Sequence, residues 1–131
     1  MTDHPNAELL KGGYAAFGAG DMDSLRNSYF DPGIQWHQPG NNHFSGTRRG
    51  IDEVLNQFMQ TFQETDGTFS TEIHDVLAND DHAVALASFT ATKDGKTITD
   101  RYTHVCHIKD GKLTESWIFG ENQPKVDEFW G

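Results

Sequence analysis

The run DRYTHVCHIKDGKLTESW, residues 100–117, brings together the side chains best suited to acid-base chemistry in this sequence. Its Asp110-Gly111 dipeptide is a two-residue hairpin signal, which predicts two antiparallel strands joined at that turn. Side chains two residues apart on a strand share a face, so Asp100, Tyr102 and His104 are expected to point the same way. A carboxyl, a phenol and an imidazole on one face predict either a pocket that handles protons or a satisfied polar surface.

The same turn predicts which residues face each other across the hairpin. With a two-residue loop, the register follows by counting outward from the turn. Three pairs are expected to lie opposite each other: His104 and Trp117, Tyr102 and Phe119, and Asp100 and Glu121. A β-bulge in the last strand would move this register by one residue, which affects the placement of Glu121.

Two earlier turn signals, Asp94-Gly95 and Asp80-Asp81, extend the counting to two more strands. They predict five further pairs: Ala85 with His104, Ala87 with Tyr102, Phe89 with Asp100, His74 with Ala87, and Val76 with Ala85. Small alanines beside large aromatic and titratable side chains leave volume above the sheet, so this face is predicted to line a small-molecule pocket. A simply filled core is the alternative. The opposite face is predicted to be aliphatic, with Ile73, Leu77, Val84, Leu86, Val105 and Ile118.

Apolar residues at helical spacing predict the elements that precede these strands. Ala7, Leu10, Tyr14 and Phe17 recur every three or four residues, which predicts a helix that ends near Gly18. This helix would carry Tyr14 toward the sheet, where it is the leading candidate for a hydrogen-bond partner of His104. The alternative for Tyr14 is a core tyrosine whose hydroxyl reaches the surface.

The rest of the chain completes the expected fold. Asp21 is a good N-cap for a short second helix, which must stop before Asp31-Pro32 because the residue before proline disfavours helix. A short strand is expected over 34–38 and a third helix over 51–62, followed by four strands from Phe69 onward. The order α-α-β-α-β-β-β-β predicts an α+β fold in which a mostly antiparallel sheet curls around the third helix.

Length, charge and cysteine content limit the class of protein. A chain of 131 residues is expected to form a single domain, residues 1–131, that folds without a metal or a disulfide. The lone Cys106 and a start without a secretory signal favour a cytoplasmic protein. A net charge of -10 and the lack of a long apolar run argue against nucleic acid or a membrane as partners.

Three segments resemble the SnoaL-like and ketosteroid isomerase-like proteins of the nuclear transport factor 2-like superfamily: YAAFGAGDMDSL, GTRRGIDEVLNQF and HVCHIKDGKLTESWIF. The resemblance covers nearly the whole chain and implies a cystatin-like, cone-shaped curved sheet with an internal cavity. The superfamily includes isomerases, polyketide cyclases, hydrolases, dehydratases and proteins without catalysis, so the fold does not specify the activity. Its members commonly form homodimers by pairing their sheets.

Family site residues are carried over by position. The position of the isomerase base is occupied here by Trp36, and the position of the family's protonated oxyanion-hole aspartate is occupied by His104. The acid-base aspartate of the SnoaL-like cyclases matches about Glu121, with Asn122 beside it. The lack of a base at Trp36 argues against a true steroid isomerase.

These positions define the candidate site. His104, Tyr14, Asp100 and Glu121 are the candidate catalytic residues. Two facing carboxyls raise one pKa, which suits Asp100 and Glu121 to acid catalysis; solvated carboxylates neutralised by Arg101 are the alternative. The candidate substrate-binding walls are aromatic: Trp36, Phe58, Phe62, Tyr102, Trp117 and Phe119.

No metal and no cofactor are expected. His104 and His107 point to opposite faces of their strand, and the other histidines lack the spacing of metal ligands. Two functions remain open: a cofactor-independent isomerase, cyclase or dehydratase acting on an apolar or polycyclic substrate, or a non-catalytic protein that binds a small ligand in the same cavity. The aliphatic sheet face predicts a homodimer, because its six side chains need cover that the three helices cannot supply.

Overall fold

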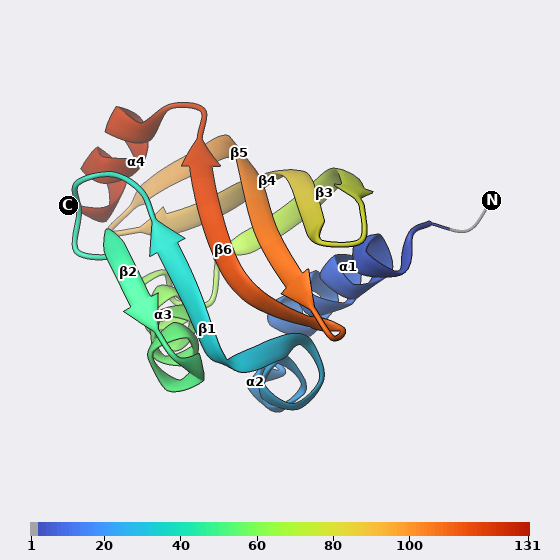
Figure 1. The fold of residues 1–131 in the computed structure, drawn as a ribbon. Helices are drawn as coiled ribbons and strands as arrows, with labels where there is room; N and C mark the ends of the chain where they lie inside the picture. Colours follow the sequence, from blue (N-terminus) through green and yellow to red (C-terminus); the bar gives the residue numbers. More distant parts are fainter. Residues whose placement is uncertain (1–2) are drawn as a thin grey trace.

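A computed structural model describes residues 3–131 of the chain (Figure 1). The elements in chain order are α1 (Pro5–Gly18), α2 (Met22–Ser24), a π-helical turn (Leu25–Tyr29), β1 (Phe30–Gln38), β2 (Gly46–Arg49), α3 (Ile51–Glu64), β3 (Ser70–Ala78), β4 (His82–Lys93), β5 (Lys96–Lys109), β6 (Lys112–Gly120) and α4 (Gln123–Trp130). The α+β fold that the sequence predicts is confirmed.

The strands form one curved sheet in the order β2-β1-β6-β5-β4-β3. Neighbouring strands are antiparallel except β1 and β6, which are parallel. α1 packs along β3 and β4, and α3 packs along β1 and β2, so both helices cover the same face of the sheet (Figure 1). α4 follows β6 and packs against β5 at one end of this face. The helices and the curved sheet therefore enclose a space between them.

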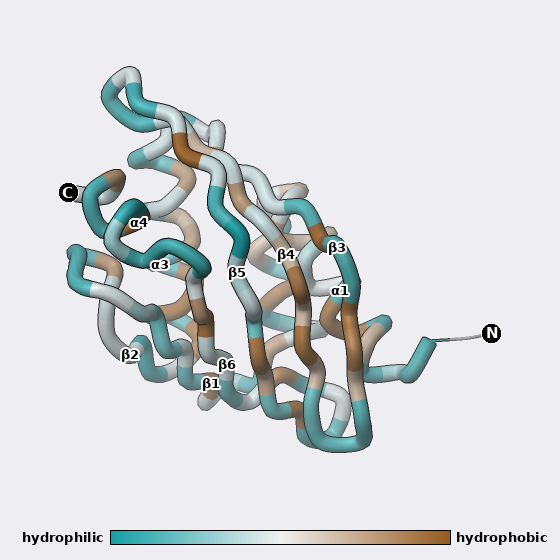
Figure 2. Tube along the Cα trace, turned by 90° about the horizontal axis from the view of Figure 1, so that it is seen from above, coloured by the Kyte–Doolittle hydropathy of each residue, from teal (hydrophilic) through white to brown (hydrophobic). Residues whose placement is uncertain are grey.

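Local signals explain the element boundaries. The Asp21 side chain accepts a hydrogen bond from the Ser24 main-chain N–H at 3.0 Å, as expected for an N-cap. Asp110 and Gly111 have φ values of 52° and 72°, which is the left-handed pair that a type I′ hairpin requires. Figure 2 shows the result along the trace: hydrophilic segments at hairpin ends and hydrophobic segments in the middle of β3 and β4.

The predicted register of the last hairpin is wrong by one residue. His107 pairs with Glu115 and Ile108 pairs with Leu113, so Thr114 is an extra residue in β6. This bulge turns every later side chain of β6 to the face opposite from the predicted one, because strand side chains alternate. The three predicted pairs are therefore replaced. His104 lies opposite Ile118, and Tyr102 lies opposite Gly120. Glu121 does not lie opposite Asp100; its main-chain N–H donates to the main-chain carbonyl of Arg101.

The earlier hairpins follow the predictions more closely. All three pairs between β4 and β5 are confirmed: Ala85 with His104, Ala87 with Tyr102, and Phe89 with Asp100. Val76 lies opposite Ala85 as predicted, but a second bulge at His74 places Ile73, not His74, opposite Ala87. Ile73 is thereby turned toward α1, where it lies in the groove formed with Lys11 and Ala15.

The outer face of the sheet differs from the predicted set for the same reason. Ile118 and Ile73 have moved to the helix-covered side, while Trp117 and Phe119 have taken places on the outer side. The outer apolar residues are Leu77, Val84, Leu86, Val105, Trp117 and Phe119. Leu77 and Phe119 are 54% and 56% exposed, so this face remains rich in uncovered apolar surface.

The sequence prediction missed β2 and α4. β2 is a four-residue edge strand of sequence Gly-Thr-Arg-Arg, which has no apolar alternation to mark it. Asn122 is the N-cap of α4, because its side chain accepts from the Lys125 N–H, and the helix buries Val126, Phe129 and Trp130. No helix within residues 3–131 has the length and apolar character to cross a membrane, and the cytoplasmic location stays a prediction.

Candidate functional site

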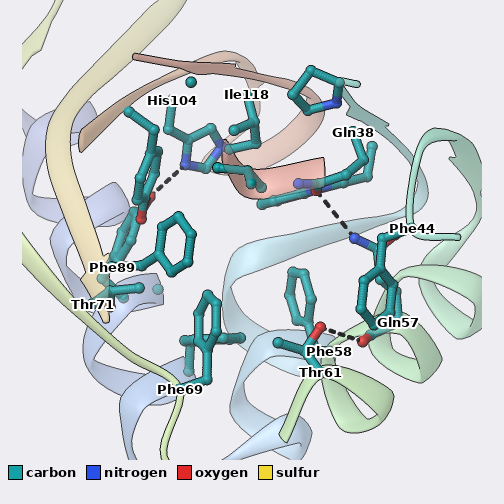
Figure 3. A pocket seen from close by; sticks show the side chains of 18 of the residues that line it. Gln38, Phe44, Gln57, Phe58, Thr61, Phe69, Thr71, Phe89, His104 and Ile118 are labelled. Atoms are coloured by element: carbon teal, nitrogen blue, oxygen red, sulfur yellow. Dashed lines mark hydrogen bonds between the residues drawn. The ribbon is translucent and has the colours of Figure 1, made fainter. Parts of the chain in front are cut away.

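A cavity of about 130 Å³ lies between the inner face of the sheet and the helices α1, α3 and α4 (Figure 3). Apolar side chains form most of its wall, including Leu10, Phe17, Phe58, Phe69 and Phe89. The tyrosines of α1 and β5, His104 and Asp100 interrupt this apolar lining. Apolar engineered cavities of roughly 150 Å³ bind benzene, so the space suits a compact ring compound.

A chain of hydrogen bonds runs along one wall of the cavity. His104 Nε2 lies 3.0 Å from Ser116 Oγ, and His104 Nδ1 lies 2.9 Å from the Tyr14 hydroxyl. The Tyr14 hydroxyl in turn lies 3.0 Å from the Tyr102 hydroxyl. Four side chains from α1, β5 and β6 are thereby connected, and the predicted contact between Tyr14 and His104 is present.

Burial controls the ionisation of these groups. Burial lowers the pKa of His104 to about 3, so the imidazole is neutral near pH 7. Burial also raises the pKa of Tyr102 to about 12, and burial together with the neighbouring Tyr102 raises the pKa of Tyr14 well above its ordinary value. The chain therefore consists of neutral donors and acceptors, and the ring nitrogen of His104 that carries the N–H decides the direction of its bonds to Tyr14 and Ser116.

Asp100 is the only carboxyl group among the lining residues within 3–131. Its side chain is 3% exposed; one oxygen accepts from the Asn122 main-chain N–H at 3.3 Å, and the other lies 3.9 Å from Lys125 Nζ. Asp100 and Tyr102 lie two residues apart on β5 and on the same face, so their Cα atoms are about 7 Å apart. A carboxyl and a phenol thus face one small volume.

The structure gathers some predicted site residues and separates others. Tyr14, Trp36, Phe58, Asp100, Tyr102 and His104 line the cavity. Phe62 lies behind the wall, with its ring centroid 4.9 Å from Phe17. Trp117 stacks on His37 on the outer face, with centroids 5.1 Å apart, and Phe119 is exposed there.

Glu121 is also outside the cavity. Its carboxylate accepts from Arg101 Nε at 2.9 Å, and this guanidinium lowers the pKa of Glu121. The predicted pairing of the Asp100 and Glu121 carboxyls is therefore wrong. The alternative, solvated carboxylates neutralised by Arg101, holds for Glu121 but not for Asp100, which is buried. The β6 bulge explains this outcome as well as the displacement of Trp117 and Phe119.

Several residues of the site were not predicted. Ser116, which bonds His104, and Ile118, which lines the cavity, were missed because the bulge reverses their faces. Gln57 and Thr61 lie on the buried face of α3, three and seven residues after Val54. Polar residues at positions where the helical period expects apolar ones could have indicated that this face lines a cavity. Gln38 follows Trp36 by two residues on β1 and shares its face.

Metal ligation has no candidate in the part of the chain that the structure describes. Residues 3–131 contain no cluster of three or more His, Cys, Asp or Glu side chains arranged to hold an ion. His82 and His107 lie opposite each other on β4 and β5, with ring centroids 4.9 Å apart, but on the outer face. The titratable groups that line the cavity are the Tyr14 and Tyr102 hydroxyls, the His104 imidazole and the Asp100 carboxyl.

Comparison with known proteins identifies the family. A profile of the SnoaL-like domain matches residues 10–116. The chain belongs to the SnoaL-like domain family. This confirms the resemblance to SnoaL-like proteins seen in the sequence.

The similarity to known proteins covers nearly the full length of this SnoaL-like chain. The structure of Bal32a, from a soil-derived mobile gene cassette, is 33% identical with a TM-score of 0.93, and 97% of each chain is covered. An uncharacterised protein of Mycobacterium tuberculosis is 29% identical over 99% of both chains. A putative SnoaL-like polyketide cyclase from Jannaschia sp. CCS1 is 18% identical with a TM-score of 0.81, covering 99% of this chain and 97% of that one, and it shows the shared fold.

Proposed function

We propose that this SnoaL-like protein binds a compact, largely apolar ring compound in the cavity and catalyses cofactor-independent proton transfer on it. Isomerisation, cyclisation and dehydration of a carbonyl compound all begin with this step. The observation that carries the proposal is the chain Ser116–His104–Tyr14–Tyr102, which aims two phenolic hydroxyls at an apolar cavity that also contains Asp100. The name of the Jannaschia relative, a putative polyketide cyclase, agrees with this class of substrate.

The proposed roles follow from the chemistry of each group. A substrate carbonyl oxygen takes the place of the hydrogen bond between Tyr14 and Tyr102 and accepts from both hydroxyls as negative charge develops on it, because each phenol has one proton to donate. Neutral His104 donates its Nδ1–H to Tyr14, which leaves the Tyr14 proton for the substrate, and Ser116 donates to His104 Nε2. The Asp100 carboxylate takes the proton from the carbon next to the carbonyl. It returns this proton to another carbon in isomerisation, to the new alkoxide oxygen in cyclisation, or to the departing hydroxyl group in dehydration.

A non-catalytic binding protein is the second candidate function, and one observation favours it. The pKa of His104 is about 3 and that of Tyr102 is about 12, whereas efficient acid-base groups titrate near the working pH. Under this alternative the same hydroxyls hold the ligand without moving a proton. Isotope exchange separates the two functions because it detects proton transfer without knowledge of the natural product.

The test uses 2-tetralone, a bicyclic ketone, in D₂O with NMR detection of deuterium at the carbons next to the carbonyl. We expect the protein to accelerate exchange, Asp100→Asn to abolish the acceleration, and Tyr14→Phe to reduce it by about 10²-fold. Glu121→Gln and Tyr29→Phe are matched controls outside the cavity and should exchange like the wild type. Binding of 2-tetralone without accelerated exchange would favour the binding protein, and unchanged exchange in both site variants would reject these roles.

We also propose that two copies associate through the outer face of the sheet. Leu77, Val84, Leu86, Val105, Trp117 and Phe119 supply an apolar surface there, and two of them are more than half exposed. A two-fold arrangement would place this surface against itself. The cavity opens on the other side of the sheet, so pairing leaves it accessible.

A further inference from the structure

The cavity wall formed by β1 and α3 contains two side-chain amides that the proposed proton transfer does not use. Gln38 comes from β1 and Gln57 from α3, and Figure 3 shows both away from His104. Trp36 connects the two regions, because its ring centroid lies 5.0 Å from that of His104 and its indole contacts Gln38. The amides are therefore part of the same cavity as the tyrosines.

The hydrogen bonds fix the orientation of both amides. Trp36 Nε1 donates to Gln38 Oε1 at 2.9 Å, and an indole N–H can only donate, so this Gln38 atom must be the oxygen. Gln57 meets the same oxygen at 3.1 Å, and only its NH₂ group can do so. The Gln57 oxygen is left as the free end of this short network.

That oxygen has no hydrogen-bond partner in the described part of the chain. Within residues 3–131, Gln57 Oε1 is the one buried side-chain nitrogen or oxygen without a hydrogen bond, and Gln57 is only 7% exposed. Folded proteins pair nearly all such atoms, because a buried acceptor without a donor is destabilising. Gln57 sits beside Val54, Phe58 and Thr61 on the buried face of α3, where an apolar residue would avoid this penalty.

We propose that Gln57 Oε1 accepts a hydrogen bond from a hydroxyl or N–H group of the ligand. This inference rests on the proposed function and narrows its ligand class: one oxygen of the ring compound meets Tyr14 and Tyr102, and a donor group at a distant position meets Gln57. Gln57 is then a specificity residue, which lets the cavity prefer a ligand with a donor at that position over one of the same size without it.

Three bicyclic compounds of similar size test the preference: 2-naphthol, 6-hydroxy-2-tetralone and 6-methyl-2-tetralone. Each is titrated into the protein and its dissociation constant measured by calorimetry. The 6-hydroxyl group can donate to Gln57, whereas 6-methyl-2-tetralone has no donor in either orientation. We expect 6-hydroxy-2-tetralone to bind about tenfold more tightly than 6-methyl-2-tetralone.

Two variants connect the preference to Gln57. Gln57→Leu should remove the tenfold preference and leave the melting temperature of the free protein unchanged or higher, because the unpaired acceptor is gone. Gln60→Leu is the matched control: it makes the same substitution at an exposed glutamine of α3 outside the cavity, so this variant should keep the preference.

The outcomes separate this inference from the proposed function. If 2-naphthol binds but the wild type does not distinguish the other two compounds, or if Gln57→Leu retains the distinction, the role of Gln57 is rejected and the binding cavity stands. If none of the compounds binds, the proposed ligand class is rejected together with this inference. The wild-type comparison decides the question even if Gln57→Leu does not fold.

Discussion

His104 is buried and hydrogen-bonded at both ring nitrogens, and as a result the stability of the fold depends on pH in the acid range. Burial lowers its pKa from 6.5 to about 3, so between these values the unfolded chain binds a proton that the folded chain does not. Its contribution to the free energy of unfolding is therefore complete above pH 6.5 and decreases as the pH falls toward 3. Over this window the loss amounts to about 4 kcal/mol.

The measurement is urea unfolding between pH 7 and pH 4 for the wild type and His104→Gln. We expect the variant to be less stable at pH 7 but to lose less stability on acidification. Val54→Ala, at a buried residue without a titratable group, is the control: it should be less stable at every pH and lose as much stability on acidification as the wild type. Parallel profiles for the wild type and His104→Gln would contradict the assignment of a strongly lowered pKa.

At the scale of elements, α4 closes the end of the cavity that the sheet leaves open. Trp130 is 6% exposed, its ring lies 4.8 Å from that of Phe44, and its carbonyl accepts from Lys93 Nζ at 2.8 Å. Trp130→Ala removes a large buried aromatic from this contact. We expect a loss of about 3–5 kcal/mol in the free energy of unfolding, measured in urea.

An exposed aromatic provides the comparison for this variant. Phe119→Ser on the outer face should change the free energy of unfolding of the monomeric fold by less than about 1 kcal/mol. Binding of 2-naphthol should weaken in Trp130→Ala and persist in Phe119→Ser. Equal losses of stability in the two variants would mean that α4 does not pack as described.

Helices, strands and turns that have local sequence signals could be predicted from the sequence. The strand register after a β-bulge, which depends on one extra residue, could not. The Asp-Gly turns, the Asp21 cap and the apolar period of α3 specify structure within a few residues, so these elements and the β4–β5 register were predicted correctly. Thr114 has no feature in the sequence that distinguishes a bulge from a regular strand position. Because strand side chains alternate, this one error in register placed Trp117, Phe119 and Glu121 on the wrong face of the sheet.

The residues of the candidate site also fall into those that the sequence predicted and those that it did not. Tyr14 and His104 are brought together by a helix and a strand that were both predicted, so their contact was predictable as well. The partner of His104 on β6, Ser116, was not, because its face depends on the bulge. Gln57 was overlooked because apolar periodicity alone describes α3, although a glutamine on that face was visible in the sequence.

At the scale of the whole molecule, the outer sheet face predicts self-association. Leu86→Glu places a carboxylate on the middle of this face and, in a two-fold pair, brings like charges together. We expect the wild type to sediment as a dimer at micromolar concentration and Leu86→Glu to sediment as a monomer. The expectation follows from the apolar area alone, since large uncovered patches are rare on monomers.

Asn56→Glu adds the same charge at an exposed position of α3 and serves as the control. It should sediment like the wild type. A wild-type protein that is monomeric at this concentration would refute the dimer, and a dimeric Leu86→Glu would place the contact elsewhere on the molecule.

The bulge at Thr114 also has a consequence for how such a protein can diverge. A point substitution in β6 alters one face of the sheet, either the cavity or the outer surface. Deletion of a single codon at Thr114 would reverse the strand that follows it, sending Trp117 and Phe119 into the cavity and Ile118 out of it. One genetic event would thus exchange the ligand-facing and surface-facing side chains together, so descendants that differ by this residue are expected to differ in both ligand and partner.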